Sequence, residues 1–348
     1  MKPRRLLLAS IAAVATAALG LSGCASPGPS TAPPAGGAPS TGASAGGATD
    51  KTFKIGSAVI LSHPALQAAE DGFKEVLTEK GIKFTIDSKN AQGESSNAST
   101  IASGFAADKD IDLILAISTP IALAMATAEK ERPILFTAVT DPVRDGLVPS
   151  WDQAGTNITG TSDLNPEAKP VTLVTQAVPT AKTIGVLYSS SESNSLAQVE
   201  AYQTEAASLS GVTIKPQGIT AAAEISAGLE ALKGVDAILI PTDNTVVAAI
   251  ASVISFGREN KIPVFCADTS TVSLGTVATR GLSYHDLGRR TGEMAAMILL
   301  DGVAINTIKP EATTSTELLV NTEAAASFGI TLPEEFVKQA AQDVKTEA

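Results

Sequence analysis

The stretch RPILFTAVTDPV, residues 132–143, runs from a short apolar segment into the polar tip Thr140-Asp141-Pro142. The stretch GVDAILIPTDNTVV, residues 234–247, does the same and ends in Thr242-Asp243-Asn244. Short apolar runs without alternation are typical of strands buried on both faces of a parallel sheet. The sequence therefore predicts two buried strands that each end in a Thr-Asp tip, either as two similar turns or as two sides of one ligand site.

Segments with strand and helix patterns alternate on both sides of these stretches. Strands are expected at residues 53–61, 82–87, 111–118, 133–139, 183–189, 212–219, 237–242 and 262–268. Helices are expected at residues 64–81, 96–107, 120–130, 195–209, 222–232 and 246–260. Such alternation predicts parallel sheets covered by helices. Because the second half repeats the order of the first, the fold class is α/β with two similar doubly wound parallel-sheet lobes.

Polar residues follow six of the expected strands. Right-handed crossovers place the carboxyl ends of parallel strands at one edge of each sheet, and ligands bind beyond that edge. Ser, Thr, Asp or Asn before a helix is also an ordinary N-cap, so each tip alone fits a cap as well as a ligand contact. The joint pattern favours one cleft shared by the lobes. The tips are His63-Pro64, Ser118-Thr119-Pro120, Thr140-Asp141-Pro142, Ser189 to Glu192, Thr242-Asp243-Asn244 and Asp268-Thr269-Ser270.

The N-terminus has the pattern of an export signal. Residues 1–5 are basic, and residues 6–20 are an apolar run too short to span a bilayer. The next residues, LSGC at 21–24, resemble the lipobox of bacterial lipoproteins, which is cut before a cysteine that then carries lipid. We expect a signal peptide at residues 1–23 and lipidation of Cys24, typically with palmitate; the alternative is a plain signal peptide with a chance cysteine. Residues 24–52, rich in Ala, Gly, Pro, Ser and Thr, are expected to form a flexible linker.

The charge of the chain argues against nucleic acid as a partner. The net charge is −11, and it becomes −14 once the three basic residues of the signal peptide are removed. Nucleic-acid binding requires a basic surface instead. With Cys24 lipidated, Cys266 is the remaining cysteine of the sequence, so no disulfide is expected within the folded part.

Several blocks of the sequence resemble a known family. SHPALQAAEDGFKEVL (62–77), FTAVTDPV (136–143), PTDNTVV (241–247) and LGRRTGEMAAMIL (287–299) occur in this order. They resemble the substrate-binding lipoproteins of ABC importers, and more narrowly the branch associated with tryptophan and tyrosine. The resemblance implies a type I periplasmic-binding-protein fold, an ABC permease and ATPase as partners, and a lipid anchor at the extracytoplasmic face of the cell membrane. It also implies amino acid transport by closure of two lobes over a small ligand.

The same resemblance implies how the chain is divided between the lobes. The two lobes of this fold are joined by three crossings, the third of which is expected near residues 281–284. Lobe one then comprises residues 53–163 plus 284–309, with a returning helix at 286–300. Lobe two comprises residues 164–283 plus 310–342, and residues 343–348 are expected to be a tail.

An amino acid offers three groups for recognition. Its carboxylate is expected at Ser118, Thr119 and Thr140, because hydroxyls and helix N-termini bind anions. Its ammonium is expected at Asp243 and Asp268, with Asp141 either adding to them or capping a turn. Tyr188 and Tyr284 are candidates for the flat walls of an aromatic pocket or for packing between the lobes. The remaining candidates are His63, which caps the first helix or touches the ligand, and Ser189, Asn194, Thr242 and Asn244.

Other classes of protein receive less support from the sequence. The chain has two histidines and no nucleophile–base motif in a fitting context, so we do not expect an enzyme. No candidate ligands share a metal-binding spacing, and neither a metal nor a cofactor is expected. A sugar- or nucleoside-binding protein of the same fold, or a ligand sensor, remains the alternative.

Overall fold

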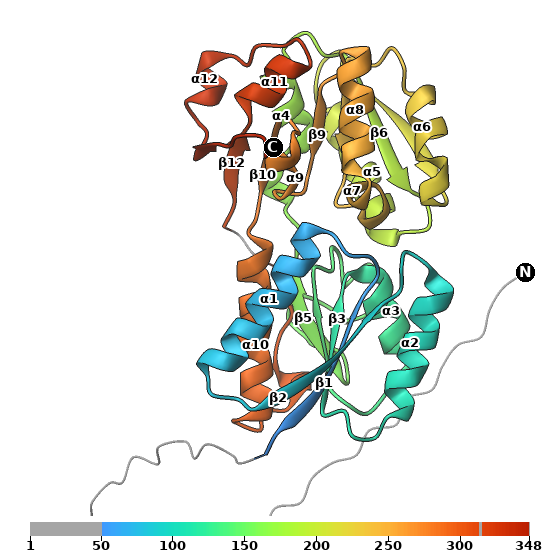
Figure 1. Cartoon of the computed structure of the whole chain (residues 1–348), viewed down its shortest axis with the longest axis vertical. Coiled ribbons are helices and arrows are strands. Elements are labelled where there is room, and N and C mark those ends of the chain that lie inside the picture. The colour runs from blue at the N-terminus through green and yellow to red at the C-terminus, as the bar shows by residue number, and fades with distance from the viewer. Residues whose placement is uncertain (1–50, 313–314, 348) are drawn as a thin grey trace, which may run out of the picture. The chain divides into compact units, whose positions relative to one another are not determined.

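The structure of the chain is a computed structural model that describes residues 51–312 and 315–347 (Figure 1). The expected signal peptide, Cys24 and nearly all of the expected linker lie outside these residues. Within the described part of the chain, no helix has the length and apolarity needed to cross a membrane.

Lobe one contains a six-stranded sheet in the order β11-β5-β4-β3-β1-β2, in which every pair of neighbouring strands is parallel. Its strands are β1 (Phe53–Val59), β2 (Phe84–Asn90), β3 (Leu113–Ile117), β4 (Ile134–Thr137), β5 (Ile158–Ser162) and β11 (Glu311–Ala312). Its helices are α1 (Pro64–Glu79), α2 (Ser95–Ala107), α3 (Thr119–Ala128), α10 (Tyr284–Leu299) and the short η3 (Ile305–Thr307).

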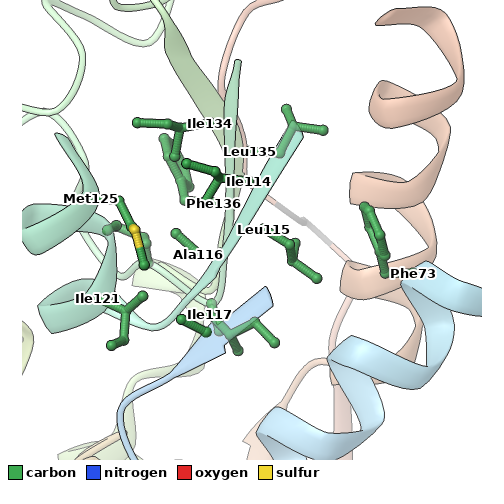
Figure 2. Packing of buried hydrophobic residues seen from close by; sticks show 14 of the residues in the cluster. Phe73, Ile114, Leu115, Ala116, Ile117, Ile121, Met125, Ile134, Leu135 and Phe136 are labelled. Carbon is green, nitrogen blue, oxygen red and sulfur yellow. The ribbon is translucent and has the colours of Figure 1, made fainter. Parts of the chain in front are cut away.

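The core of lobe one lies on both faces of this sheet. Every residue of β3, with the sequence LILAI, is buried, as the unbroken apolar run predicts. Figure 2 shows Phe73 of α1 on one side of the strands and Met125 of α3 on the other. The sheet is therefore covered on both faces by helices, and its strand ends are left as the place for a site.

Helix α10 packs against α1 although more than two hundred residues separate them in the chain (Figure 1). Glycines permit the close approach, because a Cβ at Gly288 would overlap the carbonyl oxygen of Ala69, and one at Gly72 would overlap that of His285. The chain that leaves lobe two at β10 (Ala278–Gly281) thus returns to complete lobe one.

Lobe two contains a four-stranded parallel sheet in the order β7-β6-β8-β9 and a three-stranded sheet in the order β10-β12-β13. The strands of the first are β6 (Thr183–Ser189), β7 (Thr213–Ile219), β8 (Ala237–Ile240) and β9 (Val264–Cys266); β10 pairs with β12 (Glu317–Val320), which pairs with β13 (Gln342–Asp343). The helical segments are η1 (Pro166–Ala168), α4 (Pro170–Ala177), α5 (Ser193–Ala207), η2 (Ala222–Glu224), α6 (Ile225–Ala231), α7 (Asn244–Ala248), α8 (Ile250–Asn260), α9 (Thr271–Leu274), α11 (Thr322–Ser327) and α12 (Glu334–Val337).

The expected α/β class with parallel sheets is confirmed, although β10 and β12 pair antiparallel, and the structure corrects several details. Strand β5 was not predicted, and neither were the strands β10 to β13 or the helices α4, α9, α11 and α12. The helix expected at 246–260 is interrupted at Ala249, which separates α7 from α8. Glu311 and Ala312 pair with β5, so the chain leaves the sheet of lobe one after residue 312 rather than after 309. The expected tail is partly structured, because Asp343 belongs to β13 and Val344 N–H donates to the Val320 carbonyl at 2.7 Å.

Candidate functional site

The polar strand tips of the two lobes meet around a small cavity of about 10 Å³. Seven of the residues expected at a site line it. They are His63 and Thr140 from lobe one, Asn194, Thr242, Asn244 and Asp268 from lobe two, and Tyr284 at the crossing between them. Asp163, which the sequence reasoning missed, lines it as well. We call this space the polar cavity.

His63 lies opposite Asp268 across the polar cavity. Its Nδ1 is 3.7 Å from Asp268 Oδ2, and both side chains are almost fully buried. His63 occupies the N-cap position of α1 but makes no side-chain cap hydrogen bond, so the expected capping role is wrong. Burial lowers the pKa of the His63 imidazole against the opposing attraction of Asp268. Neither of its ring nitrogens has a hydrogen-bond partner of acceptable geometry within the described residues.

Asp163 is the buried carboxylate at the crossing that follows β5. Tyr284 Oη donates a hydrogen bond to its Oδ2 at 2.9 Å, while its Oδ1 has no partner within the described part of the chain. Burial raises the pKa of Asp163. The stretch GTNITGTSD, residues 155–163, ends in Asp163, but its strand was not recognised from the sequence, so this strand tip was not counted among the candidates.

Glu192 holds the lobe-two side of the polar cavity in place. Its carboxylate accepts hydrogen bonds from the backbone N–H and side-chain amide of Asn244 and from the backbone N–H and hydroxyl of Thr245. The Asn194 amide donates to the Thr242 carbonyl at 2.9 Å, while Asn194 Oδ1 has no partner among the described residues. Glu192 therefore positions the start of α7 and the two asparagines that line the cavity.

Asp243 does not line the polar cavity, contrary to the expected contact with an ammonium group. It is fully buried at the N-cap of α7, where Oδ1 accepts from Val246 N at 2.8 Å. Its Oδ2 accepts from Ser189 N and from Ser195 Oγ at 2.7 Å. Three donors from the protein thus occupy this carboxylate, and its role is structural.

Five further residues expected at the site do not line the polar cavity either. The backbone N–H of Ser189 donates a hydrogen bond to the carboxylate of Asp243. Asp141 caps a turn, because its Oδ1 accepts from Arg144 N at 3.0 Å. Thr119 Oγ1 accepts from Thr140 N at 3.4 Å, and Ser118 precedes it at φ 86° with its hydroxyl buried. The fifth, Tyr188, lies on β6 opposite Gly218 of β7.

The side chains of Tyr188 and Ser189 cannot both face the same site, because they are adjacent on strand β6. Successive side chains of a strand point to opposite faces of the sheet. Ser189 is buried next to Asp243, while Tyr188 is half-buried among the apolar residues packed around the core of lobe two. The sequence placed both at one tip without resolving this alternation.

The two lobes touch directly at their Thr-Asp tips. Thr140 Oγ1 and Thr242 Oγ1 are 3.5 Å apart. Arg144 adds an exposed bidentate ion pair to Glu200 of α5, with distances of 2.8 and 3.1 Å. The stretches at residues 132–143 and 234–247 thus meet where the two lobes touch.

A much larger cavity of about 810 Å³ adjoins the polar cavity and shares Thr140, Asp163, Thr242 and Tyr284 with it. We call it the chamber. It lies between η1 and α4, helix α5, and strands β8 to β10. Its walls are mostly apolar and include Leu173, Tyr202, Leu239 and Phe265. Within residues 51–312 and 315–347, no group of three or more His, Cys, Asp or Glu side chains is arranged to hold a metal ion.

A two-lobed α/β fold with polar strand tips around an interlobe cavity is an arrangement that can enclose a small solute. The chain belongs to the family described as ABC transporter substrate binding protein, which it matches over residues 54–344. The family resemblance stated from the sequence is thereby confirmed. Because this family binds solutes rather than transforming them, the chain is a binding protein and not an enzyme.

Among its relatives is the tyrosine-binding protein of Clostridioides difficile (strain R20291). The two are 38% identical over 276 residues, which cover 78% of this chain and 79% of that protein. Among solved structures, an ABC domain in complex with L-Trp from Streptococcus pneumoniae is 34% identical with a TM-score of 0.80, and it covers 84% of this chain and 100% of its own. A ligand-free, open substrate-binding protein with adhesive properties from Clostridium difficile is 40% identical with a TM-score of 0.62, covering 85% and 100%.

Proposed function

We propose that this substrate-binding protein captures an aromatic L-amino acid for an ABC importer. The ammonium group of the ligand faces Asp163 and Asp268 in the polar cavity, and its side chain enters the chamber. The names of two relatives, one tyrosine-binding and one solved with L-Trp, support this ligand class.

The observation that carries the proposal is a set of buried polar atoms that have no hydrogen-bond partner among residues 51–312 and 315–347. Four such atoms belong to residues that line the polar cavity: both ring nitrogens of His63, Asp163 Oδ1 and Asn194 Oδ1. Buried polar groups in native proteins are nearly always hydrogen-bonded, so each exception calls for an explanation. A small polar ligand head between the lobes would supply the missing partners from a single molecule.

The charges around the polar cavity favour a zwitterion. Asp163 and Asp268 line it, and its lining contains no Lys or Arg. A purely anionic ligand would be repelled by the two carboxylates. An amino acid can instead direct its ammonium group to them and its carboxylate to the hydroxyls of Thr140 and Thr242. The apolar walls of the chamber then suit an aromatic side chain better than a sugar.

Calorimetry with L-tryptophan, L-tyrosine and their deaminated analogues tests the proposal. A hydrogen bond to an ionised group contributes about 1.5–3 kcal/mol, and 1.4 kcal/mol corresponds to a factor of about ten. We expect Asp163→Asn to weaken amino-acid binding about tenfold or more, while Asp141→Asn, at a turn cap, serves as the matched control. Equal affinity of the wild-type protein for an amino acid and its deaminated analogue would remove the ammonium pocket and favour the sugar or nucleoside alternative.

The place of action is part of the same proposal. A lipid on Cys24 would tether the folded lobes to the outer face of the cell membrane, next to the permease and ATPase that receive the ligand. The basic start, apolar run and LSGC block of the sequence support this anchor. Cys24→Ser should release the protein from the membrane fraction, and unchanged retention of the variant would contradict the anchor.

A further inference from the structure

The protein itself holds one oxygen of each carboxylate at the polar cavity. Asp163 Oδ2 accepts a hydrogen bond from Tyr284 Oη at 2.9 Å. Asp268 Oδ1 accepts from the backbone N–H and from the hydroxyl of Ser270, both at 2.8 Å. Asp268 Oδ2 lies 3.7 Å from His63 Nδ1, which is beyond hydrogen-bond length. Asp163 Oδ1 is buried and has no partner within the described part of the chain, so it is the oxygen that waits for a donor.

Tyr284 brings its hydroxyl to Asp163 from a fixed position. It is the first residue of α10, and the side chain of Ser283 caps this helix by accepting from Asp286 N at 3.1 Å. The ring of Tyr284 is buried with the hydrophobic core of lobe one. Because both the backbone and the ring are held, the place of the hydroxyl is held as well.

The segment that carries Tyr284 is also bonded to the strand tip that carries the second carboxylate. The carbonyl of Leu282, two residues before Tyr284, accepts from the hydroxyl of Thr269 at 2.9 Å. Thr269 directly follows Asp268 in the chain. The crossing that precedes α10 is thus connected to Asp163 on one side and to the tip at Asp268 on the other.

From these contacts we infer that Tyr284 is a positioning residue of the amino-acid site. Its hydroxyl holds Asp163 Oδ2 and so presents Asp163 Oδ1 to the ammonium group of the ligand. The inference rests on the proposed function, because it requires that the ammonium group faces Asp163. A hydrogen bond donated to a carboxylate also stabilises its ionised form, and the ionised form is the one that attracts an ammonium group. Tyr284 therefore acts through Asp163 and on the amino end of the ligand.

Tyr284→Phe tests the inference, because it removes the hydroxyl and keeps the ring in the core of lobe one. In calorimetry we expect this variant to bind L-tryptophan about tenfold more weakly than the wild-type protein does, since the lost contact is a hydrogen bond to an ionised group. Its affinity for the deaminated analogue, indole-3-propionate, should stay nearly unchanged. Tyr188→Phe is the matched control, because Tyr188 is half-buried and lines neither cavity.

A double variant tests whether Tyr284 acts through Asp163. We expect the protein with both Asp163→Asn and Tyr284→Phe to bind L-tryptophan no more weakly than Asp163→Asn alone. Two residues that serve one interaction show effects that do not add, whereas independent contacts show effects that do. Additive losses would mean that the Tyr284 hydroxyl makes a contact of its own with the ligand, and would overturn the inference.

The pH dependence of binding gives a further readout. Burial raises the pKa of Asp163, the hydrogen bond from Tyr284 opposes this rise, and the negative charge of Asp268 adds to it. Without the hydroxyl the pKa of Asp163 rises further, so on acidification Tyr284→Phe should lose affinity for L-tryptophan at a higher pH than the wild-type protein. Other side chains of the two cavities that carry or change charge in the acidic range are common to both proteins: His63, Asp268, Lys169, Glu205 and Arg280.

The outcomes separate this inference from the proposed function. If the wild-type protein binds L-tryptophan and indole-3-propionate equally well, the proposed function fails and the inference fails with it. If the wild-type protein prefers L-tryptophan and Tyr284→Phe keeps that preference in full, the inference is wrong and the proposed function stands. Equal weakening of both ligands in Tyr284→Phe would also overturn the inference, because it would indicate a general packing role.

Discussion

Replacing Asp243 should unfold lobe two at lower denaturant concentration rather than abolish a ligand contact. Its carboxylate accepts from three donors of the protein: Val246 N, Ser189 N and Ser195 Oγ. Loss of an N-cap costs about 1 kcal/mol. A buried donor left without a partner costs about 1–3 kcal/mol. Because the Ser195 hydroxyl can rotate to another acceptor, we count the cap and the Ser189 N–H, and expect Asp243→Ala to lose about 2–4 kcal/mol of unfolding free energy.

Urea unfolding monitored by circular dichroism, with calorimetry on the same proteins, is the assay. Asp243→Asn should lose less than Asp243→Ala, since its amide oxygen can still accept from Val246 N and asparagine is a good N-cap. Asp141→Ala, which removes one hydrogen bond at a half-buried turn, is the control and should lose about 1 kcal/mol or less. The reasoning fails if Asp243→Ala unfolds like the wild-type protein yet loses affinity for the amino acid.

Three further outcomes follow from contacts described above. Gly288→Ala should destabilise the protein by about 1–3 kcal/mol in urea unfolding because its Cβ overlaps α1, whereas Gly104→Ala, with open space at an exposed helix position, should stabilise it by about 0.4–1 kcal/mol; equal effects would contradict the packing of α10 on α1. Burial raises the pKa of Asp163, so amino-acid affinity should fall as the pH decreases through that raised pKa, starting above the ordinary Asp value of about 3.9, and Asp163→Asn should flatten the profile in a calorimetric pH series. Arg144→Gln breaks an exposed ion pair between the lobes, so it should change ligand affinity only slightly and reduce its dependence on salt; an unchanged salt dependence would show that the pair with Glu200 does not support closure.

The regular elements of this fold were predictable because burial leaves a clear pattern in the sequence. Strands such as β3 and β8 are apolar throughout, and helix α1 has its apolar residues on one stripe. Strand β5 was not predicted because its sequence ITGTS is mostly small and polar, although every residue of the strand is buried. The hydroxyl of Thr161 is satisfied by Thr291, 130 residues away, and a local pattern cannot reveal such a partner.

The sequence predicted where the candidate site lies, but it did not predict which polar side chains line it. Both Thr-Asp tips reach it, yet Thr242 lines the polar cavity while the adjacent Asp243 turns back to cap α7. N-caps and ligand-binding tips use the same residue types, so the sequence could not separate them. Asp163 was missed together with β5, and the unpartnered atoms that single it out exist only once the lobes are packed.

Helix α10 and strand β11 determine when lobe one can complete its folding during synthesis. Both belong to the sheet and helix layers of lobe one, but the ribosome makes them after most of lobe two. Until about residue 312 has emerged, α1 lacks the helix that covers its face around Gly72, and β5 has β4 on one side but not yet β11 on the other. The first lobe therefore cannot finish folding before most of the second has been made, and such long-range pairing is slow to form. A chain that ends before α10 would contain an incomplete lobe one. The amino-terminal half of this protein is therefore not expected to fold as an independent domain.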